Sequence, residues 1–200
     1  MGLATLACPL NARVLIFPDK PMSHVYVAIG SNVDPEENIS KAATELARLF
    51  PGARFSSWYR NRAVGFDGDD FINGVVGFES DLTLREVVER LHSVESLCGR
   101  PRNAPRWAPR SMDLDVLLYD DVVCSEPTMT LPRPDLLKRP YMLGPLAEIA
   151  PEVVHPTAGL TIGELWQRFD RDAHPMERIP SEKLTSPQSS DRHPPPKSDP

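Results

Sequence analysis

Two carboxylates separated by one residue, Asp113 and Asp115, follow a segment with four arginines and no acidic residue, 100–110. If residues 113–119 form a strand, side-chain alternation puts both carboxylates on one face and Leu114 on the other. Neighbouring carboxylates repel each other unless a cation lies between them, and such oxygen ligands suit Mg²⁺ that also carries phosphate oxygens. Arginine binds phosphate through two parallel donors. The segment therefore predicts a nucleotide site with bound metal.

The elements that would position this motif follow from hydrophobic periodicity. Short apolar runs bounded by turn residues predict strands, and apolar residues at spacings of three and four predict helices. Thr83 and Glu86 form a capping-box pattern that starts the second helix, and Gly99 ends it. The predicted strands are 25–30, 54–59, 71–79 and 113–119, the predicted helices are 35–50 and 84–98, and short C-terminal helices are expected at 141–149 and 161–169. This β-α-β-β-α-β order predicts an α+β, ferredoxin-like fold, a mainly antiparallel sheet with two helices on one face.

Composition restricts the class of protein. The chain has 200 residues, of which 40% are hydrophobic and 25% charged, as expected for one globular domain. A net charge of −6 argues against nucleic-acid binding and favours a small anionic ligand at the local arginine cluster. No run reaches 18 apolar residues, so no membrane span is expected. The three cysteines, odd in number and far apart, fit the reducing cytoplasm.

The two ends of the chain differ from its centre. Segment 1–22 is expected to be an N-terminal extension that need not be ordered, with Met22 as an alternative start. Segment 171–200 is rich in proline and polar residues and has too few apolar side chains to form a core, which predicts a disordered tail. Residues 23–170 are the predicted domain, which we expect to be monomeric.

From about Ser23 to Phe169 the chain resembles 6-hydroxymethyl-7,8-dihydropterin pyrophosphokinase of folate biosynthesis. The resemblance rests on motifs in matching order: Gly30-Ser31-Asn32, Tyr59-Arg60, Phe71-Ile72-Asn73, Glu95 to Arg102, Arg106 to Asp115, Leu131-Pro132 and Lys138-Arg139. It implies a ferredoxin-like fold. It also implies transfer of the terminal diphosphate of ATP to the hydroxymethyl oxygen of the pterin, with release of AMP and use of two Mg²⁺ ions.

The resemblance further implies a role for individual residues. Asp113 and Asp115 match the carboxylates that hold both metal ions, and with Arg100 and Arg110 they form the expected catalytic set. The expected ATP-binding residues are Glu95, Arg100, Arg102, Trp107, Arg110, Val116, Arg133 and Arg139. The expected pterin-binding residues are Val64, Phe71, Asn73 and Tyr141, in which the two aromatic rings enclose the heterocycle and the amide binds its edge.

Three positions depart from the family pattern. Arg133 stands where many members have histidine, Asn103 replaces a basic residue of the loop, and His92 replaces a glutamine. Arginine can neutralise phosphate but does not titrate near neutral pH, so proton transfer at position 133 is in doubt.

Two other functions are compatible with parts of the pattern. A ferredoxin-like domain that only binds a small ligand would not need Asp113 and Asp115 together with Arg110. Another two-metal phospho- or nucleotidyltransferase would need them, but Phe71 and Asn73 favour a pterin substrate. No Gly-x-x-x-x-Gly-Lys-Ser/Thr loop occurs, which argues against a P-loop kinase.

Overall fold

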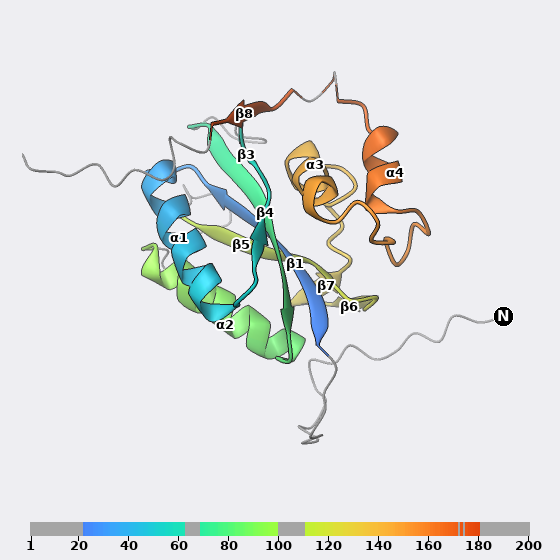
Figure 1. Ribbon diagram of the computed structural model, residues 1–200, viewed down its shortest axis with the longest axis horizontal. Coiled ribbons are helices and arrows are strands. Elements are labelled where there is room, and N and C mark those ends of the chain that lie inside the picture. The colour runs from blue at the N-terminus through green and yellow to red at the C-terminus, as the bar shows by residue number, and fades with distance from the viewer. Residues whose placement is uncertain (1–21, 63–68, 100–110, 172, 174, 181–200) are drawn as a thin grey trace, which may run out of the picture.

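The structure is a computed structural model that describes residues 22–62, 69–99, 111–171, 173 and 175–180. It has a mixed α/β fold built on an antiparallel sheet with the strand order β5-β1-β4-β3-β8, in which β2 also pairs with β4. Helices α1 and α2 cover one face of the sheet, and α3 and α4 cover the other (Figure 1). The strands of this sheet are β1 (Ser23–Ser31), β2 (Arg54–Phe55), β3 (Trp58–Asn61), β4 (Phe71–Ser80), β5 (Asp113–Tyr119) and β8 (Glu177–Ile179).

The two helices of the first face form where the apolar periodicity predicts them. Helix α1 (Pro35–Leu49) starts with proline in its first turn and buries Ile39, Ala42 and Leu46. Helix α2 (Leu84–Leu97) starts with the predicted capping box of Thr83 and Glu86. Gly99 has a φ of 80°, the left-handed conformation that ends a helix at little steric cost in glycine. Both helices pack on alternate residues of β1, β4 and β5 and form the larger core.

The opposite face has its own, smaller core. Helix α3 (Pro140–Ile149) and helix α4 (Ile162–Gln167) pack on Ala28, Val75 and Leu117 of the sheet. Both helices are predicted, although each is slightly shifted or shorter than expected. The sheet is therefore packed against helices on both faces.

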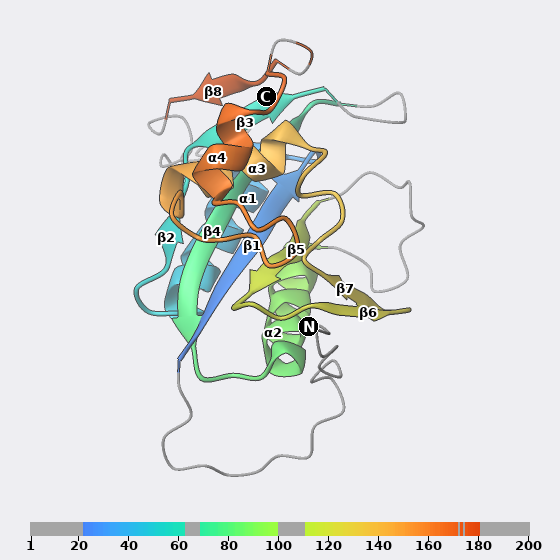
Figure 2. The ribbon, with the colours of Figure 1, turned by 90° about the vertical axis from the view of Figure 1, so that its right-hand side faces the viewer.

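Three features differ from the sequence prediction. The predicted strand 54–59 divides into β2 and β3, because the Ser56 hydroxyl accepts a hydrogen bond from the Val75 N–H at 2.9 Å in place of a backbone carbonyl. The hairpin of β6 (Cys124–Glu126) and β7 (Met129–Leu131) was not predicted, and it lies beside β5 (Figure 2). Strand β8 lies inside the segment 171–200 assigned to a disordered tail, which is wrong for 177–179. These residues pair with β3 and bury Ile179.

Candidate active site

The candidate site is built on one row of residues across the sheet. Gly30 of β1 is the register partner of Asn73 in β4 and of Asp113 in β5, and Tyr59 of β3 is opposite Asn73. In the next row Asp115 is opposite Ala28, which belongs to the core under α3. Because residues directly opposite each other in a sheet project to the same face, Asn73 and both carboxylates lie on the α3 face.

The predicted strand 113–119 and its alternation are confirmed. Leu114 and Val116 are buried in the core beneath α1 and α2, on the face opposite Asp113 and Asp115. The side chain of Val116, an expected ATP-binding residue, therefore points to the other face of β5, although it also borders the cavity described below. An edge strand with two carboxylates on one side and a hydrophobic core on the other holds the carboxylates in fixed positions.

Glu95 of α2 is buried and contacts the backbone between the two carboxylates. Its Oε1 atom accepts a hydrogen bond from the Leu114 N–H at 2.9 Å, and only 8% of the residue is exposed. Strand β5 is at the edge of the sheet, so this N–H has no neighbouring strand to bind. Glu95 takes that place and ties α2 to the strand that carries Asp113 and Asp115.

Arg133 pairs with one of the two carboxylates. Its Nη1 atom lies 2.8 Å from Oδ1 of Asp115, and the side chains are 34% and 24% exposed, respectively. The Arg133 backbone N–H also donates to the Leu117 carbonyl at 3.0 Å, which attaches the loop after β7 to the edge of β5. The structure thus brings Arg133 into direct contact with Asp115.

Asn73 is buried beside a glycine. Its Nδ2 atom donates to Oδ1 of Asn61 at 2.6 Å, which orients the carboxamide. A Cβ atom on Gly30 would lie 2.8 Å from Oδ1 of Asn73 and 3.8 Å from the Phe71 ring. Only glycine leaves room for this carboxamide over β1. Phe71, Asn73 and Gly30 therefore form one half-apolar, half-polar surface next to Asp113.

Tyr141 lies near the start of α3, within electrostatic reach of the carboxylates. Burial raises the pKa of its hydroxyl above the usual 10.0, the positive charge of Arg139 opposes this rise, and the negative charges of Asp135, Asp113 and Asp115 add to it. Tyr141, at the start of α3, is thus near enough to Asp113 and Asp115 for their charges to affect its pKa.

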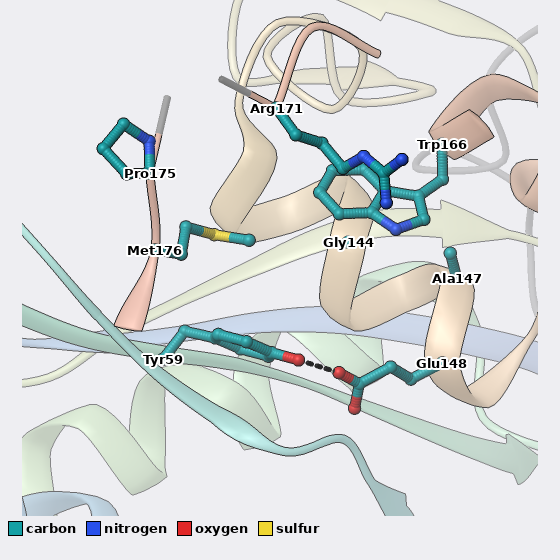
Figure 3. A pocket seen from close by; sticks show the side chains of 8 residues that line it. All are labelled: Tyr59, Gly144, Ala147, Glu148, Trp166, Arg171, Pro175 and Met176. Carbon is teal, nitrogen blue, oxygen red and sulfur yellow. Dashed lines mark hydrogen bonds between the residues drawn. The ribbon is translucent and has the colours of Figure 1, made fainter. Parts of the chain in front are cut away.

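The other end of α3 is fastened to β3 by Glu148. One of its carboxylate oxygens accepts a hydrogen bond from the Tyr59 hydroxyl (Figure 3). The other accepts a hydrogen bond from the Ser57 N–H at 2.8 Å. Burial and the hydrogen bond to Glu148 raise the pKa of Tyr59 to about 12. The pair borders a cavity of about 380 Å³ whose wall includes Trp166, with the Arg171 guanidinium 5.8 Å from its ring centre. These contacts fix α3, and so Tyr141, over the sheet.

A larger cavity of about 470 Å³ opens beside Asp115. Helix α2, strand β5, the β6–β7 hairpin and the loop that follows it form its walls. Its polar lining residues are His92, Asp115, Glu126, Thr128, Thr130, Arg133 and Asp135. The cavity is large enough for part of a nucleotide, and it shares Asp115 with the carboxylate pair.

The donor chemistry of the carboxylates suits Mg²⁺. In the part of the chain that the structure describes, no group of three or more His, Cys, Asp or Glu side chains is arranged to hold a metal ion. Mg²⁺ is usually bound by one or two carboxylates together with waters and substrate phosphates, not by a cage made only of protein. Two carboxylates beside an open cavity meet that requirement.

Some predicted site residues lie outside the described residues. These are Val64, Arg100, Arg102, Trp107 and Arg110. Of the others, the structure brings Glu95, Asp113, Asp115, Arg133 and Tyr141 to one end of β5, and Phe71 and Asn73 to the neighbouring strand β4. Arg139 is the residue before the first turn of α3, close enough to Tyr141 to affect its pKa.

Sequence reasoning missed two supporting residues, Asn61 and Glu148, and it did not predict the contact of Glu95 with the edge of β5. Asn61 and Glu148 act through partners that are 12 and 89 residues away along the chain. A helix-surface glutamate and a strand-end asparagine have no periodic signal that marks these contacts.

Among the described residues no helix is both long and apolar enough to cross a membrane.

Known proteins resemble the chain over the same region. The family model described as 7,8-dihydro-6-hydroxymethylpterin-pyrophosphokinase matches residues 26–151. The 2-amino-4-hydroxy-6-hydroxymethyldihydropteridine pyrophosphokinase of Synechocystis sp. is 40% identical over 148 residues, which cover 72% of this chain and 75% of that protein. The protein of the same name from Methylorubrum extorquens is 35% identical over 162 residues, or 79% of this chain and 99% of that protein.

Solved structures share the fold. Wild-type HPPK-DHPS of Plasmodium falciparum aligns with a TM-score of 0.58 and 11% sequence identity, over 75% of this chain and 45% of that chain. The present chain thus spans less than half the length of that structure. At this identity the likeness extends to the fold.

Proposed function

The chain belongs to the 7,8-dihydro-6-hydroxymethylpterin-pyrophosphokinase family, and we propose that it transfers diphosphate from ATP to 6-hydroxymethyl-7,8-dihydropterin in folate biosynthesis. The family match over residues 26–151 is the observation that carries the proposal. It covers both the row of Gly30, Asn73 and Asp113 and the cavity beside Asp115. The site thus has two parts that share β5, as two substrates that react with each other require.

The pterin site would lie over β4 and β1. Asn73, oriented by Asn61, offers amide donors and acceptors to the edge of the heterocycle, and Gly30 leaves space for this contact. Phe71 and Tyr141 would enclose the ring from the sheet and from α3. Val64 completes the expected set, in a segment outside the described residues. In this arrangement the hydroxymethyl group would have to lie toward Asp113, which is in the same row as Asn73 and is separated from it by Gly30.

The ATP site would occupy the cavity beside Asp115. Arg133 lies in its wall, Val116 borders it, and Glu95 supports β5 from behind. Arg139, the residue before α3, is proposed to add a further positive charge, as the family resemblance implies. Arg100, Arg102, Trp107 and Arg110 are proposed to add positive charge and an aromatic surface from the segment between α2 and β5, as the family resemblance implies. Catalysis would rest mostly on positioning and charge neutralisation, as is usual in phosphoryl-type transfer.

The reaction forms one bond and breaks one. The pterin hydroxymethyl oxygen attacks the β-phosphorus of ATP, the bond from that phosphorus to the α–β bridging oxygen breaks, and AMP leaves with the bridging oxygen while the hydroxyl proton is released. Asp113 and Asp115 would hold two Mg²⁺ ions. When bound there, the metal offsets the charge on the phosphate oxygens and steadies the attacking and leaving oxygens. The protein supplies orientation and counter-charge from Arg100 and Arg110.

Other features of the proposal follow from the sequence and the sheet. The strand order β5-β1-β4-β3, in which α1 and α2 each connect two strands that have one other strand between them, supports assignment to the ferredoxin-like plan. We propose a catalytic domain over residues 23–170 with β8 as an added edge strand, a monomeric state and a cytoplasmic location. The partners are small molecules, ATP and the dihydropterin.

The carboxylate pair offers the sharpest test of the proposal. Asp113→Asn and Asp115→Asn each remove a metal ligand but keep the side-chain volume, so each should reduce turnover by at least about 100-fold without unfolding the protein. Turnover would be measured as Mg²⁺-dependent AMP release, and folding by circular dichroism. Near-normal turnover in either folded variant would contradict the proposed site.

A further inference from the structure

Arg133 contacts an oxygen of Asp115 that a metal ion bound to this carboxylate could also use. The Nη1–Oδ1 distance of 2.8 Å is that of a direct, charge-assisted hydrogen bond. Mg²⁺ binds a carboxylate oxygen at about 2.0–2.1 Å and carries the same sign of charge as the guanidinium. The guanidinium and a metal ion at Asp115 therefore repel each other and compete for the same carboxylate.

The backbone of Arg133 is fixed, whereas its side chain has room to move. Its N–H donates to the Leu117 carbonyl, and its carbonyl accepts from the Leu136 N–H, both at 3.0 Å. The side chain lines the cavity of about 470 Å³ and is about one-third exposed. A rotation about side-chain bonds alone can thus carry the guanidinium from Asp115 into the cavity.

The cavity is where the proposed function places the phosphates of ATP. A guanidinium that leaves Asp115 would gain a phosphate, to which its planar donors bind in pairs. We infer that Arg133 is a resident counter-ion of Asp115 in the nucleotide-free protein, and that it exchanges Asp115 for the triphosphate when ATP and metal bind together. This inference rests on the proposed function, because it requires that Asp115 binds metal and that the cavity binds ATP.

The exchange makes metal and nucleotide binding interdependent. Metal alone must displace Arg133 without giving the guanidinium a new partner. Metal that arrives with ATP supplies the phosphate that receives it. Binding of each ligand must then favour binding of the other by the same factor. Arg133 would thus keep Asp115 neutralised between turnovers and disfavour binding of metal without nucleotide.

The competition between Arg133 and metal for Asp115 can be tested in the full-length protein without turnover. Mn²⁺ is titrated into the protein, and the paramagnetic resonance signal of the free ion is measured. The proteins are the wild type, Arg133→Gln, Arg133→Lys, Asp115→Asn and Arg48→Gln. Arg48 is a matched control because it also pairs with a carboxylate, Glu45 at 2.6 Å, but on α1 at the opposite face of the sheet. Each titration is repeated with a non-hydrolysable ATP analogue, and thermal unfolding shows whether each variant is folded.

Without nucleotide, Arg133→Gln should bind Mn²⁺ about two- to five-fold more tightly than the wild type, the range expected when a partly exposed ion pair no longer competes. Arg133→Lys, which keeps the charge, should fall between them, and Arg48→Gln should match the wild type. With the analogue present, the order should reverse, because Arg133→Gln has lost a phosphate contact.

Unchanged Mn²⁺ affinity in folded Arg133→Gln would overturn the inference but leave the proposed function intact. Equal tightening in Arg48→Gln would also overturn it, since the effect would then be one of total charge. Mn²⁺ binding that Asp115→Asn does not weaken would instead refute the metal site of the proposed function, and the inference with it. The two failures are therefore distinguishable.

Discussion

Replacement of Glu95 tests whether this residue holds the two carboxylates in place through the backbone. In the structure the side chain is buried and its Oε1 atom accepts the Leu114 N–H at 2.9 Å. Glu95→Ala leaves that buried donor without its acceptor and removes packed methylene groups. A buried donor left without its acceptor costs about 1–3 kcal/mol and the lost packing adds to this, so we expect Glu95→Ala to reduce the free energy of unfolding by about 2–4 kcal/mol.

Glu95→Gln is the matched variant, because the amide oxygen can still accept the Leu114 N–H. We expect it to lose about 1 kcal/mol or less in this bond and to retain most Mn²⁺ binding at Asp113 and Asp115. Urea unfolding followed by circular dichroism measures the free energies, and hydrogen exchange of the Leu114 amide reports on the bond itself. If Glu95→Ala lies within about 0.5 kcal/mol of the wild type, or if Ala and Gln behave alike in both measurements, Glu95 does not position β5 as argued.

Three further predictions concern other parts of the fold. A Cβ atom on Gly30 would lie 2.8 Å from Oδ1 of Asn73. Gly30→Ala should therefore raise the KM for the pterin by about ten-fold and change the KM for ATP much less. Equal changes of the two KM values in steady-state assays would contradict this role of Gly30. A Cβ atom on Gly144 would lie 2.9 Å from two Trp166 ring carbons, so Gly144→Ala should lower the free energy of unfolding in urea by about 1–3 kcal/mol. Unchanged stability would show that Trp166 and α4 can move away without cost. His155 is buried, its Nδ1 accepts hydrogen bonds from the Thr157 and Ala158 N–H groups, and burial lowers its pKa below 6.5. Because the unfolded chain then binds more protons, the free energy of unfolding should fall as pH drops through and below about 6.5. An equal fall in His155→Gln would exclude this histidine as the source.

Local patterns were sufficient to predict β5 and α2, but not the β6–β7 hairpin that forms part of the cavity wall. The alternation in β5 placed Asp113 and Asp115 on one face, because a strand that covers a core on one side must present every second residue to the other. The capping box at Thr83 and the apolar stripe of α2 likewise depend only on neighbouring residues. Side-chain alternation, a capping box and an apolar stripe are present wherever the strand or helix forms, whatever packs against it.

The contacts between elements could not be predicted in this way. Strand β8 has three residues and forms because Ile179 is buried beside β3, about 120 positions earlier in the chain. The bond between Tyr59 and Glu148 and the pairing of Arg133 with Asp115 also depend on how distant elements pack. Arg133 was expected to bind ATP on the basis of the family resemblance alone. Its contact with Asp115, a proposed metal ligand, has no signal in the sequence.

Product analysis tests the proposed function most directly. The purified full-length protein is incubated with Mg²⁺, ATP and 6-hydroxymethyl-7,8-dihydropterin, and nucleotides and pterins are separated and quantified by chromatography and mass spectrometry. The proposal predicts AMP and the pterin diphosphate in equal amounts, both dependent on Mg²⁺ and both lost in folded Asp115→Asn. Formation of ADP with a pterin monophosphate, or no nucleotide product at all, would contradict it.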